Sequence, residues 1–315
     1  MVILLGPTAV GKTDYSLELA SRYDSPIISC DSRQIYKEMS IGTAVPDASQ
    51  LAAVKHYFIQ DHSVEDLYTA GLYEQEALGL IGRLFDEGHE TLVMTGGSMF
   101  YIDAVCKGLD DIPGGSPELR ASLLKRLAEE GVESLSAQLR ELDPETYHSV
   151  DILNGQRLVR ALEVCITTGR PFSSFKTSHL KKRDFEIEKI GLVRPREELY
   201  DRINRRVVAM MDRGLLDEVR SLVRFRDLTA LQTVGYKECF EYLDGVDGGI
   251  SAGLAEGDAA GLAGRLTGGR AGGLSGGRGI SLDETVAKIQ TNTRHYAKKQ
   301  LTWWKRDPDI RWIEL

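Results

Sequence analysis

A glycine-rich loop near the N-terminus contains the residues with the clearest chemical potential. Its pattern, G-x-x-x-x-G-K-[ST], is matched by Gly6, Pro7, Thr8, Ala9, Val10, Gly11, Lys12 and Thr13. In such a loop the backbone N–H groups surround a phosphate at the N-terminus of a helix, where the helix dipole favours anions. Lys12 would add a positive charge, and the Thr13 hydroxyl would be a ligand for Mg²⁺. The loop predicts that a phosphorylated ligand binds, without identifying it.

Two polar residues, Asp31 and Ser98, follow apolar runs farther along the chain. Asp31 comes directly after residues 27–30, and Ser98 follows residues 91–94 through two glycines. Ligands of an open parallel sheet bind at the carboxyl ends of its strands, so the Asp31 carboxylate could hold Mg²⁺ or act as a general base. It could equally cap the turn that follows. No acidic residue directly follows the run at 91–94, so a Walker B carboxylate is missing.

Arg202 and Arg206 lie four residues apart in a segment with helical periodicity, and they therefore share one face of the expected helix. Beside the phosphate loop, two guanidinium groups could clamp a diphosphate through paired hydrogen bonds. The alternative is an ordinary solvated helix face. The spacing alone leaves both interpretations open.

Two further basic clusters have helical spacing, Arg157 with Arg160 and Arg294 with Lys298. The second cluster precedes two consecutive tryptophans at 303–304. Cations interleaved with aromatic rings suit a polynucleotide, because they neutralise its phosphates while its bases stack on the rings. The competing interpretation is a solvated charged face beside packed tryptophans.

The elements that must position these residues alternate between strand and helix over the first 110 residues. Apolar runs at 2–5, 27–30 and 91–94 alternate with helical periodicity at 13–23 and 68–85. This alternation predicts an α/β fold, a P-loop NTPase-like, doubly wound parallel sheet with helices on both faces. A returning strand is expected at 185–193 and one long helix at 197–224.

Residues 113–184 depart from this pattern because helical periodicity dominates, at 117–130, 132–141 and 154–168. We expect an inserted, mostly helical subdomain here, with residues 1–112 and 185–315 forming the P-loop core.

The glycine-rich stretch 247–278 has too few apolar residues to offset the entropy of ordering it, which predicts a flexible loop. Ser281 and Glu284 then match a capping box, which indicates a last helix running to Trp304.

The composition is that of an ordinary globular protein. Of 315 residues, 42% are hydrophobic and 27% charged, which excludes a wholly disordered chain. No apolar run approaches the roughly 20 residues of a membrane span, and the first residues lack the pattern of a signal peptide. The four cysteines lie far apart, so neither a disulfide framework nor a zinc site is expected. These features lead us to expect a cytoplasmic protein without a membrane partner, and we expect a monomer.

The net charge of −8 is spread unevenly along the chain. Residues 1–110 carry 7 basic and 16 acidic side chains. Two stretches are strongly basic: 156–183 has seven Lys or Arg against one Glu, and 288–306 has six with no acidic residue. The total argues against a non-specific coat for nucleic acid, whereas the distribution permits binding of one shaped RNA element.

Seven sequence blocks, in order along nearly the whole chain, resemble the tRNA dimethylallyltransferase (tRNA isopentenyltransferase) family. They are GPTAVGKT, CDSRQIYKEMSIGTAVP, TGGSMFYIDAVCKGL, DPETYHSVDILNGQRLVRALEV, YDRINRRVVAMMDRGLLDEV, TVGYKE and TRHYAKKQLTWW. The resemblance implies transfer of a dimethylallyl group from dimethylallyl diphosphate to the exocyclic amine of the adenosine 3′ of the anticodon. It also implies Mg²⁺ as cofactor and the tRNA anticodon stem-loop as partner.

The resemblance implies residue roles as well. Asp31 would be the general base and Ser98 would help to position the amine. The diphosphate would lie on the loop at 6–13, with Mg²⁺ near Thr13 and Arg206 on the far side. The residues implied to meet tRNA are Asp31, Ser32, Arg33, Gln34, Ser98, Arg120, Gln156, Arg157, Leu158, Val159 and Arg160. The basic cluster of Arg294 and Lys298 adds a further candidate contact.

Two features depart from the pattern of the family. Ser98 stands where the family usually has Thr, which keeps the hydroxyl, and 247–278 looks like an inserted passive loop. Two other functions fit parts of the sequence. A P-loop small-molecule kinase would share the loop and the sheet but would need neither the basic clusters nor the tryptophans. A non-catalytic RNA-binding protein could use the loop as a nucleotide switch.

Overall fold

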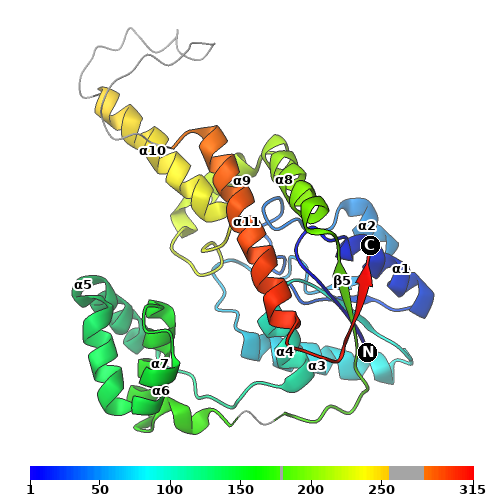
Figure 1. The fold of residues 1–315 in the computed structure, drawn as a ribbon, viewed down its shortest axis with the longest axis horizontal. Coiled ribbons are helices and arrows are strands. Elements are labelled where there is room, and N and C mark those ends of the chain that lie inside the picture. The colour runs from blue at the N-terminus through cyan, green and yellow to red at the C-terminus, as the bar shows by residue number, and fades with distance from the viewer. Residues whose placement is uncertain (178–179, 255–279) are drawn as a thin grey trace. The chain divides into compact units, whose positions relative to one another are not determined.

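A computed structural model describes residues 1–177, 180–254 and 280–315. Within them the chain forms two compact units (Figure 1). Unit 1 comprises Met1–Cys106 and Arg183–Leu315, and unit 2 comprises Lys107–Lys182. Most of the expected loop at 247–278 lies outside the described residues. Its first part, 247–254, continues a helix, so the prediction of a loop is wrong there.

Unit 1 contains a sheet in which every strand pairing is parallel. Its strand order is β3-β2-β4-β1-β5-β6. The strands are β1 (Val2–Leu5), β2 (Ile27–Ser29), β3 (His56–Tyr57), β4 (Val93–Thr95), β5 (Glu188–Val193) and β6 (Ile310–Glu314). The three apolar runs of the first 110 residues are thus strands that lie side by side in the order β2, β4, β1.

Alternate residues of β1 pack into two different cores, one on each face of the sheet. Val2 and Leu4 join a cluster with residues of α1 (Lys12–Tyr23) and α8 (Arg196–Asp212). Ile3 and Leu5 join a cluster with residues of α3 (Ala70–Asp86) and α4 (Met99–Lys107). Because side chains alternate along a strand, both faces are covered by helices. The predicted doubly wound parallel sheet is confirmed.

The segment expected to be one long helix at 197–224 is interrupted, so that prediction is wrong. α8 ends at Asp212, and α9 (Leu215–Ser221) begins after Gly214, which has φ of 94°. This left-handed conformation strains any residue with a Cβ, and it lets the chain turn at a glycine. The apolar periodicity continues across the break, which explains why the sequence of this segment resembled that of a single helix.

The last two helices of unit 1 are α10 (Tyr236–Leu254) and α11 (Leu282–Trp304). The predicted capping box is confirmed, because the Ser281 side chain accepts from the Glu284 N–H while the Glu284 side chain accepts from the Ser281 N–H. α11 packs against both α8 and α10 (Figure 1). No helix in the described part of the chain combines the length and apolar character needed to cross a membrane.

Unit 2 is built from α5 (Pro117–Leu142), α6 (Pro144–Ser149) and α7 (Gly155–Thr168), with α5 beside the other two (Figure 1). α5 is kinked at Gly131, which has φ of 80° and separates the two expected helices. A small hydrophobic core holds these helices together, with Leu123, Leu135, Leu139, Leu158 and Leu162 among its fully buried members.

Candidate functional site

The phosphate loop connects β1 to α1 and places a lysine back over its own backbone. Lys12 Nζ donates hydrogen bonds to the carbonyl oxygens of Gly6 at 2.8 Å and Pro7 at 2.9 Å. Gly11, the residue before α1, has φ of 116° and provides no side-chain cap. It therefore leaves the first N–H groups of the helix uncovered. Burial is the main cause that lowers the pKa of Lys12 to about 8, and the charge of Arg206 adds to it.

The two arginines of α8 donate hydrogen bonds to residues of the phosphate loop. Arg202 Nε donates to the Ala9 carbonyl at 2.8 Å, and Arg206 Nη1 donates to Thr8 Oγ1 at 3.3 Å. Burial lowers the pKa of Arg206, and the neighbouring charge of Arg202 lowers it further. The i, i+4 spacing therefore marks a face turned to the loop, and the solvated-face alternative is wrong for this pair.

Asp31 follows β2 and caps the turn that comes next. Its Oδ1 accepts from the N–H groups of Arg33 at 2.9 Å and Gln34 at 3.3 Å. Ser98 supports the same turn, because its Oγ accepts from the Ser32 N–H at 2.7 Å and donates to Ser32 Oγ at 2.9 Å. The capping role of Asp31 is thus present, and it leaves Oδ2 free of these two bonds.

A cavity of about 530 Å³ brings these parts together within unit 1. The predicted residues that line it are Thr8, Ala9, Gly11, Lys12, Thr13, Asp31, Gln34 and Arg206. Ser98, Ser32 and Arg33 do not line it, and neither do Gly6, Pro7 and Val10. Ser98 therefore acts on the cavity only through the turn at 31–34. In the described part of the chain no group of three or more His, Cys, Asp or Glu side chains could hold a metal ion.

Among the lining residues, Tyr296 and Gln300 of α11 were missed from the sequence, and Arg202 was weighed only as a partner of Arg206. Tyr296 and Gln300 lie four residues apart on α11, inside the block TRHYAKKQLTWW. The spacing of Tyr296 and Gln300 could have predicted that they share one face of α11. The prediction was instead based on the basic residues of the same block, which lie on another face. Tyr296 donates to the Gly97 carbonyl at 3.1 Å.

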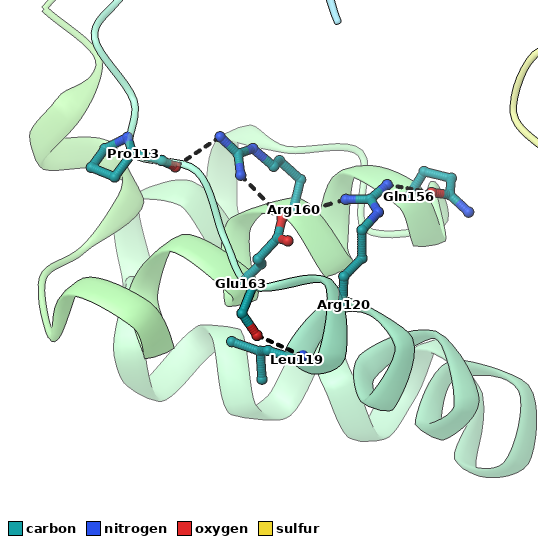
Figure 2. A network of polar contacts seen from close by, with 7 residues as sticks. Pro113, Leu119, Arg120, Gln156, Arg160 and Glu163 are labelled. Atoms are coloured by element: carbon teal, nitrogen blue, oxygen red, sulfur yellow. Dashed lines mark hydrogen bonds and ion pairs between the residues drawn. The ribbon is translucent and has the colours of Figure 1, made fainter. Parts of the chain in front are cut away.

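Two of the residues expected to meet tRNA, Arg120 and Arg160, pair in unit 2 with one buried carboxylate, and a third, Gln156, bonds to Arg120 (Figure 2). Glu163, whose side chain is 5% exposed, pairs with Arg160 at 3.0 Å and with Arg120 at 3.4 Å. Arg120 also donates to Gln156 Oε1 at 3.2 Å, and Arg160 donates to the Pro113 carbonyl at 3.0 Å. We call Arg120, Gln156, Arg160 and Glu163 the Glu163 cluster.

The neighbouring residues of α7 differ in accessibility. Arg157 is exposed, and its guanidinium has no hydrogen-bond or ion-pair partner among residues 1–177, 180–254 and 280–315. Leu158 and Val159 are fully buried in the core of unit 2. Their side chains hold the unit together, so only their backbone could contact RNA.

The two cations of the basic cluster on α11 differ in their contacts. Arg294 donates to Asn204 Oδ1 at 2.6 Å and to Thr291 Oγ1 at 2.8 Å, which ties α11 to α8. Lys298 is exposed. Of the two tryptophans, Trp304 is buried, and Trp303 is partly exposed and donates to Asp103 Oδ2 at 2.8 Å. The expected contact of Arg294 and Lys298 with tRNA stays a prediction, and the Arg294 guanidinium already bonds to Asn204 and Thr291.

Comparison with known proteins agrees with this architecture. A family model described as "IPP transferase" matches residues 34–307. A tRNA dimethylallyltransferase 1 of Bacteroides thetaiotaomicron is 47% identical, covering 99% of this chain and 91% of the relative. A tRNA dimethylallyltransferase 2 of Porphyromonas gingivalis is 48% identical, with 99% and 93% covered.

Two solved structures are similar as well. A tRNA isopentenylpyrophosphate transferase of Bacillus halodurans has a TM-score of 0.64 and 31% identity, with 99% of this chain and 89% of the other covered. A eukaryotic dimethylallyltransferase acting on tRNA has a TM-score of 0.72 at 21% identity, covering 100% and 73%, and supports the fold alone. With a family model across most of its length and full-length relatives that share nearly half its residues, the chain belongs to the tRNA dimethylallyltransferase family.

Proposed function

We propose that the protein transfers the dimethylallyl group of dimethylallyl diphosphate to the exocyclic amine of the adenosine 3′ of the tRNA anticodon. One observation carries this proposal: a single cavity holds both an anion-binding loop and a carboxylate. Lys12 and Arg206 line it on the side of the loop, and Asp31 lines it at the end of β2. The charge of Asp31 acts on the pKa of both cations, which supports a short separation.

In the proposed step, the amine nitrogen forms a bond to C1 of the allyl group. The bond from C1 to the diphosphate oxygen breaks, and its electron pair stays on that oxygen. The proton of the amine passes to the Asp31 carboxylate, which lies free of any ion pair in the described structure. Negative charge grows on the diphosphate as it leaves, and the loop N–H groups, Lys12 and Arg206 stabilise it.

Mg²⁺ fits this arrangement beside Thr13, whose side chain stands at the start of α1 and lines the cavity. A single hydroxyl with no cluster of carboxylates suits an ion held mainly by diphosphate oxygens and water. Bound there, the ion would neutralise part of the charge on the leaving group. Lys12 and Arg206 would share the remaining charge.

The tRNA anticodon stem-loop is the proposed partner of unit 2 and of the turn at 31–34. Arg157 supports this proposal because its charge is exposed and unpaired among the described residues, which suits a phosphate. An activity on tRNA supports a cytoplasmic location. The proposed site needs residues of one chain only, which is compatible with a monomer.

The proposal is tested by incubating the protein with dimethylallyl diphosphate, Mg²⁺ and unmodified tRNA, and by measuring allylated adenosine by mass spectrometry. The sharpest variant is Asp31→Asn, because its carbonyl oxygen can still accept from the Arg33 and Gln34 N–H groups while the base is lost. We expect about a 100-fold or greater loss of rate with tRNA binding retained.

Asp66→Asn is the matched control, since Asp66 also caps a turn, through the Ser63 N–H at 2.8 Å, but does not line the cavity. It should behave as the wild type. Absence of product from the wild type, together with ATP turnover on a small acceptor, would indicate a kinase instead. Normal turnover by Asp31→Asn would exclude Asp31 as the base.

A further inference from the structure

Gln300 connects two parts of the cavity that lie far apart in the sequence. It lies on α11 and is fully buried. Its Oε1 accepts a hydrogen bond from the Thr8 N–H at 2.8 Å, and its Nε2 donates to the Gly97 carbonyl at 2.8 Å. One side-chain amide therefore joins the phosphate loop to the backbone just after β4.

The Gly97 end of this connection lies next to the proposed general base. A Cβ built on Gly97 would lie 3.6 Å from Asp31 Oδ2 and 2.8 Å from Gln300 Nε2, so only glycine fits between them without a shift. Tyr296, one turn earlier on α11, donates to the same carbonyl. Burial is the main cause that raises the pKa of Tyr296, so its hydroxyl stays a neutral donor.

The Thr8 end of the connection lies next to the proposed leaving-group site. Thr8 Oγ1 accepts from Arg206, and the residues that follow form the loop that ends at Lys12. The carbonyl oxygen and the amide nitrogen of Gln300 each already have a partner, and the side chain is buried. Through these two bonds Gln300 influences the position of the Thr8 N–H and of the Gly97 carbonyl.

We propose that Gln300 is a positioning residue that fixes the separation between the leaving diphosphate and Asp31. This inference rests on the proposed transfer reaction. Transfer needs the amine, C1 and the leaving oxygen in line, and a small displacement of either end of such an arrangement lowers the rate steeply. The Gln300 amide binds Thr8 and Gly97 at the same time. It therefore sets the distance between the diphosphate and Asp31 without touching the reacting groups.

The test uses Gln300→Met, which keeps the length of the side chain and removes both hydrogen bonds. Gln290→Met is the matched control: Gln290 also lies on α11, and its Nε2 donates to the Asn204 carbonyl at 3.3 Å outside the cavity. Three quantities are measured in the full-length protein: kcat for transfer to tRNA, Kd for inorganic diphosphate with Mg²⁺, and hydrogen exchange of the Thr8 amide.

Gln300→Met should lower kcat by about 10- to 100-fold while the Kd for diphosphate changes by less than about threefold. The Thr8 amide should exchange at least about tenfold faster, because it has lost its acceptor. Gln290→Met should leave all three quantities unchanged. A merely structural role would instead lower kcat and diphosphate affinity together, and that result would overturn the inference.

Tyr296→Phe decides the question if Gln300→Met fails to fold, because it removes one hydroxyl from the same carbonyl. We expect kcat to fall by about three- to tenfold with an unchanged Kd for diphosphate. Wild-type kcat in Gln300→Met, or in Tyr296→Phe where Gln300→Met does not fold, would overturn the positioning role and leave the proposed function intact, provided that the wild-type enzyme is active. A wild-type protein that forms no allylated adenosine would overturn both.

Discussion

The phosphate loop and the Glu163 cluster hold their cations in opposite electrostatic situations. At the loop, Lys12 and Arg206 donate to carbonyl and hydroxyl oxygens, which orient the cations without neutralising them. In the cluster, the Glu163 carboxylate pairs with two arginines. Positive charge at the loop thus has no ion-pair partner in the described residues, whereas positive charge in the cluster is partly neutralised inside the protein.

Burial is the main cause of the lowered pKa of Lys12 and of Arg206, and the charge of Asp31 offsets it in part. Burial makes the charged form of each cation less stable, and an arriving anion relieves that instability. The Glu163 cluster contains its counter-ion already, so it contributes to the fold of unit 2 with or without RNA.

The largest expected effect comes from removing a charge at the loop. Lys12→Met should lower the rate of transfer by about 100- to 1000-fold, because one of the buried cations that stabilise the leaving diphosphate is lost. Single-turnover transfer to tRNA measures this. Lys237→Met, at an exposed position of α10, is the control and should retain the wild-type rate. A loss of less than about threefold in Lys12→Met would mean that charge at the loop is not reserved for the ligand.

The next effect concerns the stability of unit 2. Glu163→Gln should lower the free energy of unfolding by about 1–3 kcal/mol, because two arginines lose a buried carboxylate. Thermal unfolding, followed by calorimetry, gives this value. Glu129→Gln is the control, since the Glu129 side chain is 61% exposed and pairs only weakly with Lys125 at 3.8 Å. Equal melting temperatures for both variants would show that the Glu163 cluster does not stabilise the unit.

A smaller effect is expected at Arg157, the exposed cation beside the cluster. Arg157→Ala should weaken tRNA binding by about three- to tenfold and reduce the dependence of affinity on salt by about one phosphate contact. Arg126→Ala serves as control, because Arg126 is held by Glu130 and Gln138. Filter binding at several salt concentrations measures both. An affinity unchanged at every concentration would exclude this contact.

The smallest effect is a pH dependence that arises from Lys12. With its pKa near 8, Lys12 loses its proton as the pH rises through that value, so the free protein binds an anion less well above pH 8 than below it. Between pH 7 and 8.5 the Kd for diphosphate should rise by about fourfold. Comparison with Lys12→Met at each pH removes the titration of diphosphate itself. If the Kd for diphosphate changed with pH in the same way in both proteins, Lys12 would not titrate in this pH range.

Local features of the site could be predicted from the sequence. The phosphate loop, the cap formed by Asp31 and the capping box at Ser281 each depend on residues a few positions apart. The alternation of short apolar runs with helices also sufficed to predict the central strands, because β1, β2 and β4 are buried almost throughout. Spacing within one helix correctly brought Arg202 and Arg206 to a common face.

Contacts between distant segments could not be predicted. Gln300 and Thr8 are separated by 292 positions, and nothing near either residue indicates the other. Arg294 resembled a surface cation because its partner Asn204 lies on another helix. The end of α8 was missed because the apolar pattern continues past Gly214 while the backbone turns there. In each case tertiary packing decided what short-range pattern left open.

The hydrogen bond from Thr8 to Gln300 also has a consequence for biosynthesis. The phosphate loop leaves the ribosome long before α11 does, because α11 lies far later in the sequence. β1 pairs with β4 on one side and with β5 on the other. Because β5 is translated after β4, the pairing of β1 with β5 can form only later. Contacts of such high sequence separation form late in folding. A nascent chain therefore lacks the connection from Thr8 to Gly97 through Gln300 until α11 has docked.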